Sequence, residues 1–166
     1  MKQYVLKLIG LVCLVTFPAL TADAHCRAQE QTIFACALGT KMVAVCASHD
    51  LSPTRGYVQY RFGPKNAPEF TFPAATEPSS RAAMQARTLM FAGGGGGYIR
   101  FINGRYHYIV YTAIGKGWGT KDGVAVEKDG KLLTHFPCQD VPVSKLGEDF
   151  FTQAGLAADP VEFLLP

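Results

Sequence analysis

The fold of this protein is decided by residues 98–111, which read Tyr98-Ile99-Arg100-Phe101-Ile102-Asn103-Gly104-Arg105-Tyr106-His107-Tyr108-Ile109-Val110-Tyr111. Apolar and aromatic residues dominate the runs on both sides of Asn103-Gly104. An Asn-Gly pair between such runs is the strongest short-range signal for a β-hairpin, because both residues tolerate the positive φ of a type I′ turn. The segment therefore predicts two antiparallel strands joined by a tight turn.

Working outward, the same pattern predicts strands on both sides of this hairpin. Residues 124–134 form a second hairpin around Lys128-Asp129-Gly130, and residues 32–46 form a third around Gly39-Thr40. Single strands are expected at 57–62, 69–72 and 88–91. Residues 74–86 are small and polar, which indicates a loop with at most one helical turn.

One helix is expected near the C-terminus. Ser144 can cap it, Glu148 and Asp149 lie in its early turns, and Gly155 can end it. Together these elements predict a mainly β fold, an antiparallel barrel or sandwich of about eight strands with a short C-terminal helix.

The first 24 residues are typical of a secretory signal peptide. Lys2 and Lys7 precede an apolar run over residues 8–20, and Ala22-Asp23-Ala24 forms a small-x-small cleavage site. The run is shorter than the about 20 apolar residues of a transmembrane helix. We therefore expect a signal peptide at 1–24, a single β-rich domain at 25–166, a periplasmic or secreted location, and no stable membrane insertion after cleavage.

The cysteines support the same location. Cleavage would remove Cys13 and leave an even set of four, Cys26, Cys36, Cys46 and Cys138. Exported chains usually pair such a set in disulfides, and four cysteines allow three connectivities. Pairing Cys36 with Cys46 and Cys26 with Cys138 is favoured, because the first bond would join neighbouring strands. The spacings contain no C-x2-C unit, so no zinc site is expected.

Composition and motifs exclude several function classes. The net charge is +3, and +2 without the first 24 residues, which is no basic footprint for nucleic acid. The chain has no G-x-S-x-G elbow. Its scattered carboxylates single out no glycosidase pair, and an enzymatic function stays open as a third class that a close carboxylate pair beside a pocket would favour. Cleavage would place His25 at the N-terminus, but the spacing of His49, His107 and His135 supports no copper site. We expect no catalytic residues, no cofactor and no metal.

Glycine is distributed unevenly along the chain. Eleven of the 17 glycines lie between Gly93 and Gly130. The run over residues 93–97 does not fit a phosphate-binding loop, because a strand follows it instead of Lys-Ser/Thr and a helix. Residues 115–119 form a second glycine-rich loop. In a hairpin closed at Asn103-Gly104 both loops lie at the same end, so we expect them to be neighbours.

These two loops predict a protein-recognition patch, because aromatic anchors and a positive charge are typical of binding hot spots. Its residues are Gly94, Gly95, Gly96, Gly97, Tyr98, Lys116, Gly117 and Trp118. The alternative is that Tyr98 and Trp118 only cap the core. A second function class stays open, a small-ligand or glycan-binding barrel in which Tyr106, Tyr108 and Trp118 line a pocket.

Residues 94–117 resemble part of the periplasmic proteinaceous inhibitors of lysozyme. The signature of that family is Ser-Gly-x-x-Tyr, followed after a hairpin by Tyr, a short spacer and Lys-Gly. Here Gly94 to Tyr98 matches the first motif, with Gly94 in place of the serine, and Tyr111 to Gly117 is similar to the second, with a longer spacer.

The resemblance implies that Tyr98, Lys116 and the backbone of residues 94–97 enter a lysozyme cleft and engage its catalytic carboxylates. The partner would then be a lysozyme or another cell-envelope protein. The whole chain also looks like small exported β proteins of bacteria, a resemblance that implies no particular activity.

Overall fold

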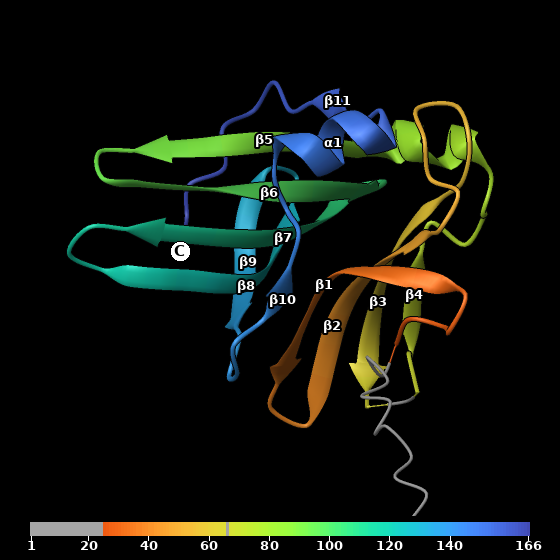
Figure 1. Ribbon diagram of the computed structural model, residues 1–166. Coiled ribbons are helices and arrows are strands. Elements are labelled where there is room, and N and C mark those ends of the chain that lie inside the picture. The colour runs from red at the N-terminus through yellow and green to blue at the C-terminus, as the bar shows by residue number, and fades with distance from the viewer. Residues whose placement is uncertain (1–24, 66) are drawn as a thin grey trace, which may run out of the picture.

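A computed structural model describes residues 25–65 and 67–166. The expected signal peptide and Cys13 lie outside the described residues. Eleven strands form two sheets in the described residues, and Figure 1 shows them as two layers set at an angle to each other. The mainly β prediction is confirmed. The sheets are sandwich-like and do not close into a barrel, so the barrel alternative is wrong.

The five-stranded sheet has the strand order β10-β1-β2-β3-β4. Its strands are β1 (Glu30–Leu38), β2 (Lys41–Ser48), β3 (Val58–Pro64), β4 (Phe70–Phe72) and β10 (Val143–Ser144). The six-stranded sheet has the order β11-β5-β6-β7-β8-β9. Its strands are β5 (Met84–Phe91), β6 (Gly94–Asn103), β7 (Tyr106–Gly115), β8 (Gly119–Lys128), β9 (Lys131–Pro137) and β11 (Ala157–Ala158). A 3-10 helix, η1 (Pro78–Ala83), precedes β5, and a helix, α1 (Glu148–Ala154), lies beside β5 and β6 (Figure 1).

The three expected hairpins are present, and one turn is shifted by a residue. Asp129 and Gly130 have φ values of 53° and 74°, as their hairpin requires. In the middle hairpin Asn103 still pairs with Tyr106, so the turn residues are Gly104, with φ 61°, and Arg105. The expected type I′ turn at Asn103-Gly104 is therefore replaced by a turn with glycine at its first central position.

The glycine run lies mostly in a strand, which corrects the glycine-rich loop expected at residues 93–97. Strand β6 begins at Gly94, and only Ala92 and Gly93 lie in the turn before it. A Cβ atom at Gly94 would collide with the carbonyl oxygen of Ile114, and one at Gly96 with that of Thr112. These glycines allow β6 to approach β7 more closely than a side chain would permit.

Helix α1 begins later than expected. Ser144 does not cap it, because Ser144 lies in β10 and pairs with Phe34. The residue before the helix is Gly147, and Gly155 ends the helix in the left-handed conformation, with φ 60°, as predicted. No helix in the described part of the chain is long and apolar enough to cross a membrane.

The main core lies between the two sheets, and α1 covers part of it. Strands alternate their side chains between two faces, so one face of each sheet supplies this core. Among its fully buried side chains are Phe34, Val45, Tyr60, Met84, Ile99, Phe101 and Val110, and the helix adds Phe150, Phe151 and Ala154.

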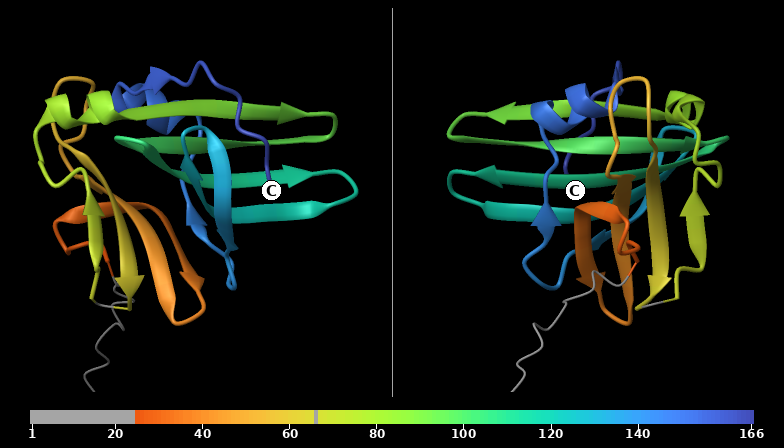
Figure 2. Two further views of the ribbon diagram at one scale, coloured as in Figure 1. Left: turned by 180° about the vertical axis from the view of Figure 1, so that it is seen from behind. Right: turned by 45° about the vertical axis from the view of Figure 1, so that its right-hand side comes forward.

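The outer face of the six-stranded sheet is covered by residues 159–166, which we call the C-terminal strap. Phe163 of the strap packs on the rings of Tyr98 and Tyr111, with ring centroids 5.3 and 5.5 Å away. Arg100 Nε donates to Asp159 Oδ2 at 2.6 Å, an ion pair that fixes the start of the strap. The left view of Figure 2 shows the strap running across this face.

The disulfides are Cys26–Cys46 and Cys36–Cys138, so the favoured connectivity is wrong. Cys36 faces the core between the sheets, where Cys138 packs beside it. Cys46 faces the other side of the same sheet, where Cys26 covers it. Cys36 and Cys46 therefore point to opposite faces and are unable to bond. The presence of two disulfides indicates an oxidising compartment.

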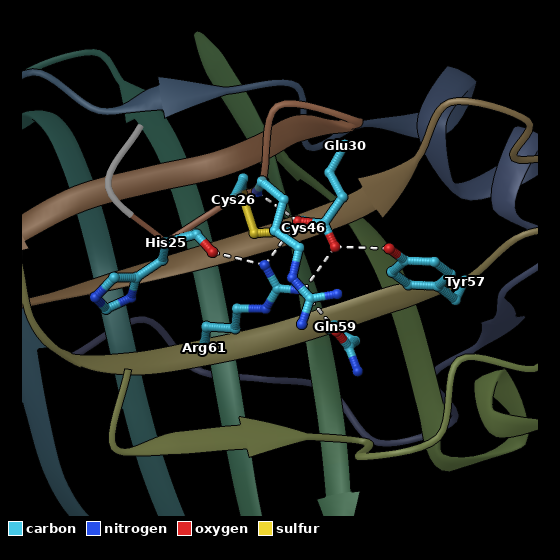
Figure 3. Close-up of a disulfide and its surroundings, with 8 residues drawn as sticks. His25, Cys26, Glu30, Cys46, Tyr57, Gln59 and Arg61 are labelled. Carbon is cyan, nitrogen blue, oxygen red and sulfur yellow. Dashed lines mark hydrogen bonds and ion pairs between the residues drawn. A yellow bond between two sulfur atoms is a disulfide. The ribbon is translucent and has the colours of Figure 1, made fainter. Parts of the chain in front are cut away.

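Beside the Cys26–Cys46 bond lies a buried ion pair, shown in Figure 3. Arg61 donates to both carboxylate oxygens of Glu30 at 2.7 Å and to the His25 carbonyl at 2.6 Å. The Tyr57 hydroxyl donates to the same carboxylate at 2.6 Å. Burial alone would raise the pKa of Glu30, but these hydrogen bonds and that of the Arg27 amide outweigh it and lower the pKa to about 2.

Candidate functional site

The two glycine-rich segments meet at one end of the six-stranded sheet, as predicted. Gly95 pairs with Ile114, and the Lys116 amide donates to the Gly93 carbonyl at 3.2 Å. We call residues 90–94 together with 114–119 the tip. Figure 1 shows both turns side by side at the left, where they project beyond the five-stranded sheet.

The tip exposes large apolar side chains on both of its faces. Met90 is 87% exposed and Ile114 is 59% exposed, on the face that continues the core side of the sheet. On the opposite face Phe91 and Trp118 are 36% and 40% exposed, and their rings meet edge to face at 5.7 Å. Clustered exposed apolar side chains are typical of protein-interaction sites.

Trp118 is held in place although it is exposed. Its indole lies directly over the α-carbon of Gly115, where a Cβ atom would collide with the ring. The Lys121 ammonium lies 5.8 Å from the ring centroid and also donates to the Pro166 carbonyl at 2.7 Å. An aromatic side chain held in this way loses little conformational entropy when a partner covers it.

Lys116 places a positive charge at the end of the tip. It is exposed, and it forms no ion pair with any residue in 25–65 or 67–166. Its side-chain stem passes close to Gly93, where an added Cβ would lie 2.9 Å from the lysine Cβ. The ammonium is therefore available to a carboxylate on a partner.

Two of the predicted patch residues lie in the interior. Tyr98 is fully buried under the C-terminal strap, and its hydroxyl donates to the Val161 carbonyl at 3.0 Å. Burial and the nearby Asp159 carboxylate raise the pKa of Tyr98 to about 12. Gly97 is covered by α1, because a Cβ there would lie 3.0 Å from the Phe151 ring. A partner reaches neither residue, and for Tyr98 the core alternative fits.

The tip thus unites Gly94, Lys116, Gly117 and Trp118, while Gly95 and Gly96 lie half-buried behind it in β6. Sequence reasoning missed Met90, Phe91 and Ile114. Each of these apolar residues stands next to a glycine-rich turn, which was the available signal.

The pocket expected from Tyr106, Tyr108 and Trp118 is absent from the described residues. Tyr106 begins β7, whereas Trp118 follows the end of that strand at Gly115. A strand of ten residues spans about 30 Å, so these rings lie at opposite ends of the sheet. Tyr108 instead faces the five-stranded sheet, where its ring stacks on Tyr60 at 5.4 Å.

His25 is buried. Its Nε2 lies 2.9 Å from the Pro64 carbonyl oxygen, beside the Cys26–Cys46 bond. Within residues 25–65 and 67–166, no group of three or more His, Cys, Asp or Glu side chains is placed to hold a metal ion.

Fold and tip together define a class of protein, a disulfide-linked, two-sheet β protein that presents apolar side chains and a lysine on a projecting pair of hairpins. No family model, no curated protein and no solved structure matches the chain. Its function is therefore inferred from the geometry.

Proposed function

We propose that this protein is an exported, non-enzymatic protein-binding module that binds its partner through the tip. The observation that carries the proposal is the exposure of Met90, Phe91, Ile114 and Trp118 on the tip. Beside them Lys116 pairs with no carboxylate among the described residues. Lysozyme is the partner that the local resemblance implies.

The apolar side chains account for the affinity. Fully burying a large apolar side chain contributes about 1.5–3 kcal/mol. Four such side chains, already partly covered in the free protein, supply on the order of 5 kcal/mol before the costs of association. Binding of this kind fits a cleft that is narrow enough to take two hairpin turns.

Lys116 accounts for the choice of partner. An ammonium on a flexible stem is a point charge that pairs well with carboxylates. The cleft of a lysozyme carries such carboxylates at its catalytic centre. The contacts differ from those implied by the resemblance, because Trp118 and Phe91 take the place of the buried Tyr98.

Inhibition assays with the purified protein against c-, g- and i-type lysozymes test this proposal. We expect inhibition at micromolar concentrations, and a loss of at least about tenfold in Trp118→Ala and in Lys116→Ala. Lys131→Ala is the matched control, because Lys131 is an exposed lysine at a different turn, and it should inhibit normally.

Two results would count against the proposal. No inhibition of any lysozyme type at micromolar concentration rejects lysozyme as the partner. Equal inhibition by the wild type and by folded Trp118→Ala rejects the tip as the binding surface. Export is tested separately by mass spectrometry of the protein recovered outside the cytoplasm, where we expect His25 as the first residue.

A further inference from the structure

A concave site lies far from the tip, at the mouth between the two sheets. It has a volume of about 330 Å³, at the lower end of the range for small-molecule pockets. We call it the aromatic slot. Strands of both sheets supply its five rings, Tyr60, Phe62, Phe70, Tyr108 and Phe136.

The rings form the floor and the walls of the slot. Tyr60 is buried at the floor and its ring stacks on that of Tyr108. The ring centroids of Phe70 and Tyr108 are 4.9 Å apart. The rings of Phe62 and Phe136, from different sheets, have their centroids 6.2 Å apart. Phe136 is 38% exposed, so one side of the slot is open to solvent.

The rings and one carboxylate of the slot favour a cation. Among the described residues, Glu69 is the one charged side chain that lines the slot. The chain already places an ammonium beside it, because Lys41 Nζ lies 2.7 Å from Glu69 Oε2 and 5.2 Å from the Phe62 ring centroid. Aromatic faces carry partial negative charge, so the rings attract a cation and repel an anion, while Lys41 offsets the charge of Glu69.

We propose that the aromatic slot binds a small molecule that carries a quaternary ammonium group. Such a group is a weakly hydrated cation with an apolar surface, and it gains both from burial among rings and from the cation–π attraction. A primary ammonium is more strongly hydrated, and that of Lys41 lies beside Glu69 outside the lining of the slot. The site is independent of the tip and of the proposed partner.

Calorimetric and NMR titrations of the purified protein with choline test this proposal. The matched probe is 3,3-dimethyl-1-butanol, which has the shape of choline without the charge. We expect saturable binding of choline, and binding of the neutral probe at least about tenfold weaker. The resonances that shift should belong to Phe70, Tyr108 and Phe136.

Three variants separate the contributions of charge and of rings. Glu69→Gln should weaken choline binding and leave the neutral probe unchanged, because only the cation uses the carboxylate. Lys41→Met should strengthen choline binding, since it frees that carboxylate. Phe136→Leu keeps an apolar side chain without a π face, and we expect it to weaken choline by about threefold or more.

All three positions are at least partly exposed, so the variants should fold, and circular dichroism checks this. Equal affinity for choline and the neutral probe would overturn the proposal, because the slot would then be merely apolar. Absence of saturable choline binding would overturn it as well. Unchanged choline affinity in folded Phe136→Leu would place binding elsewhere and reject the slot.

Discussion

The buried pair of Arg61 and Glu30 makes a prediction about acid stability. Arg61→Met keeps an apolar stem of similar length but removes the guanidinium. Glu30 then loses both hydrogen bonds from Arg61 and retains those from Tyr57 and the Arg27 amide. A carboxylate remains in a site where its side chain is fully buried.

The magnitude follows from the pKa of Glu30. Removing one partner of a buried pair costs about 3–5 kcal/mol. Independently, lowering the pKa from 4.5 to about 2 on folding means that ionised Glu30 stabilises the fold by about 3 kcal/mol at pH 7. Because the folded pKa is the lower one, this contribution is complete above pH 4.5 and is lost as the pH falls towards 2.

In Arg61→Met the effect of burial on the pKa of Glu30 should outweigh that of the remaining hydrogen bonds, so this pKa should rise. At acid pH the carboxyl of the folded variant should therefore be protonated. The variant should therefore be about 3–5 kcal/mol less stable than the wild type at pH 7, and the difference should shrink at pH 3.

Urea unfolding followed by far-UV circular dichroism, with the disulfides intact, measures both differences. Lys41→Met is the control, because it breaks an exposed ion pair and should cost less than about 1 kcal/mol at either pH. The reasoning is refuted if Arg61→Met loses the same stability at pH 3 as at pH 7, or less than about 1 kcal/mol at pH 7.

Two further predictions concern the disulfides and the glycine run. Replacing Cys36 and Cys138 by alanine should lower the free energy of unfolding by about 5 kcal/mol, and replacing Cys26 and Cys46 by about 3, because the bonds span 102 and 20 residues. Urea unfolding measures both losses, and a Cys36–Cys46 peptide in non-reducing peptide mapping would contradict the pairing. Gly96→Ala should lower the free energy of unfolding by more than about 2 kcal/mol, because the new Cβ collides with the Thr112 carbonyl. Gly147→Ala should lower it by less than about 1 kcal/mol, because Gly147 has an extended φ and open space around it. Equal losses in thermal or urea unfolding would show that the close approach of β6 to β7 does not matter.

The hairpins were predictable because each is encoded locally. Asp129-Gly130 and Asn103-Gly104 supply turn chemistry, and the flanking runs supply strand residues. In the structure the turn expected at Asn103-Gly104 lies at Gly104-Arg105, one residue later than expected. The local sequence pattern does not determine strand register to within one residue.

The disulfide pairing and the fate of Tyr98 depended on which face of a sheet each residue occupies. Cys36 and Cys46 look like natural partners on neighbouring strands, yet they point to opposite faces. Tyr98 looks like an exposed anchor, yet the C-terminal strap covers its face. The sequence of strand β6 does not indicate that residues 159–166 will cover Tyr98.

The glycine run and the aromatic slot were missed for different reasons. Glycine has no side chain, so a run of glycines lacks the alternation of apolar and polar residues by which a strand is predicted. The close approach of two backbones also leaves no pattern in the sequence. The slot unites Phe62, Phe70 and Phe136 from separate strands, and only the packing of the two sheets brings them together.

Strand β7 carries the tip at one end and the aromatic slot at the other. From Tyr108 to Ile114 it runs about 20 Å at 3.4 Å per residue, so the two sites share no side chain. Perturbations this far apart, with no shared contacts, normally add. The two proposals together therefore predict that small-cation binding at the aromatic slot and protein binding at the tip can each be strengthened or abolished by substitution without altering the other.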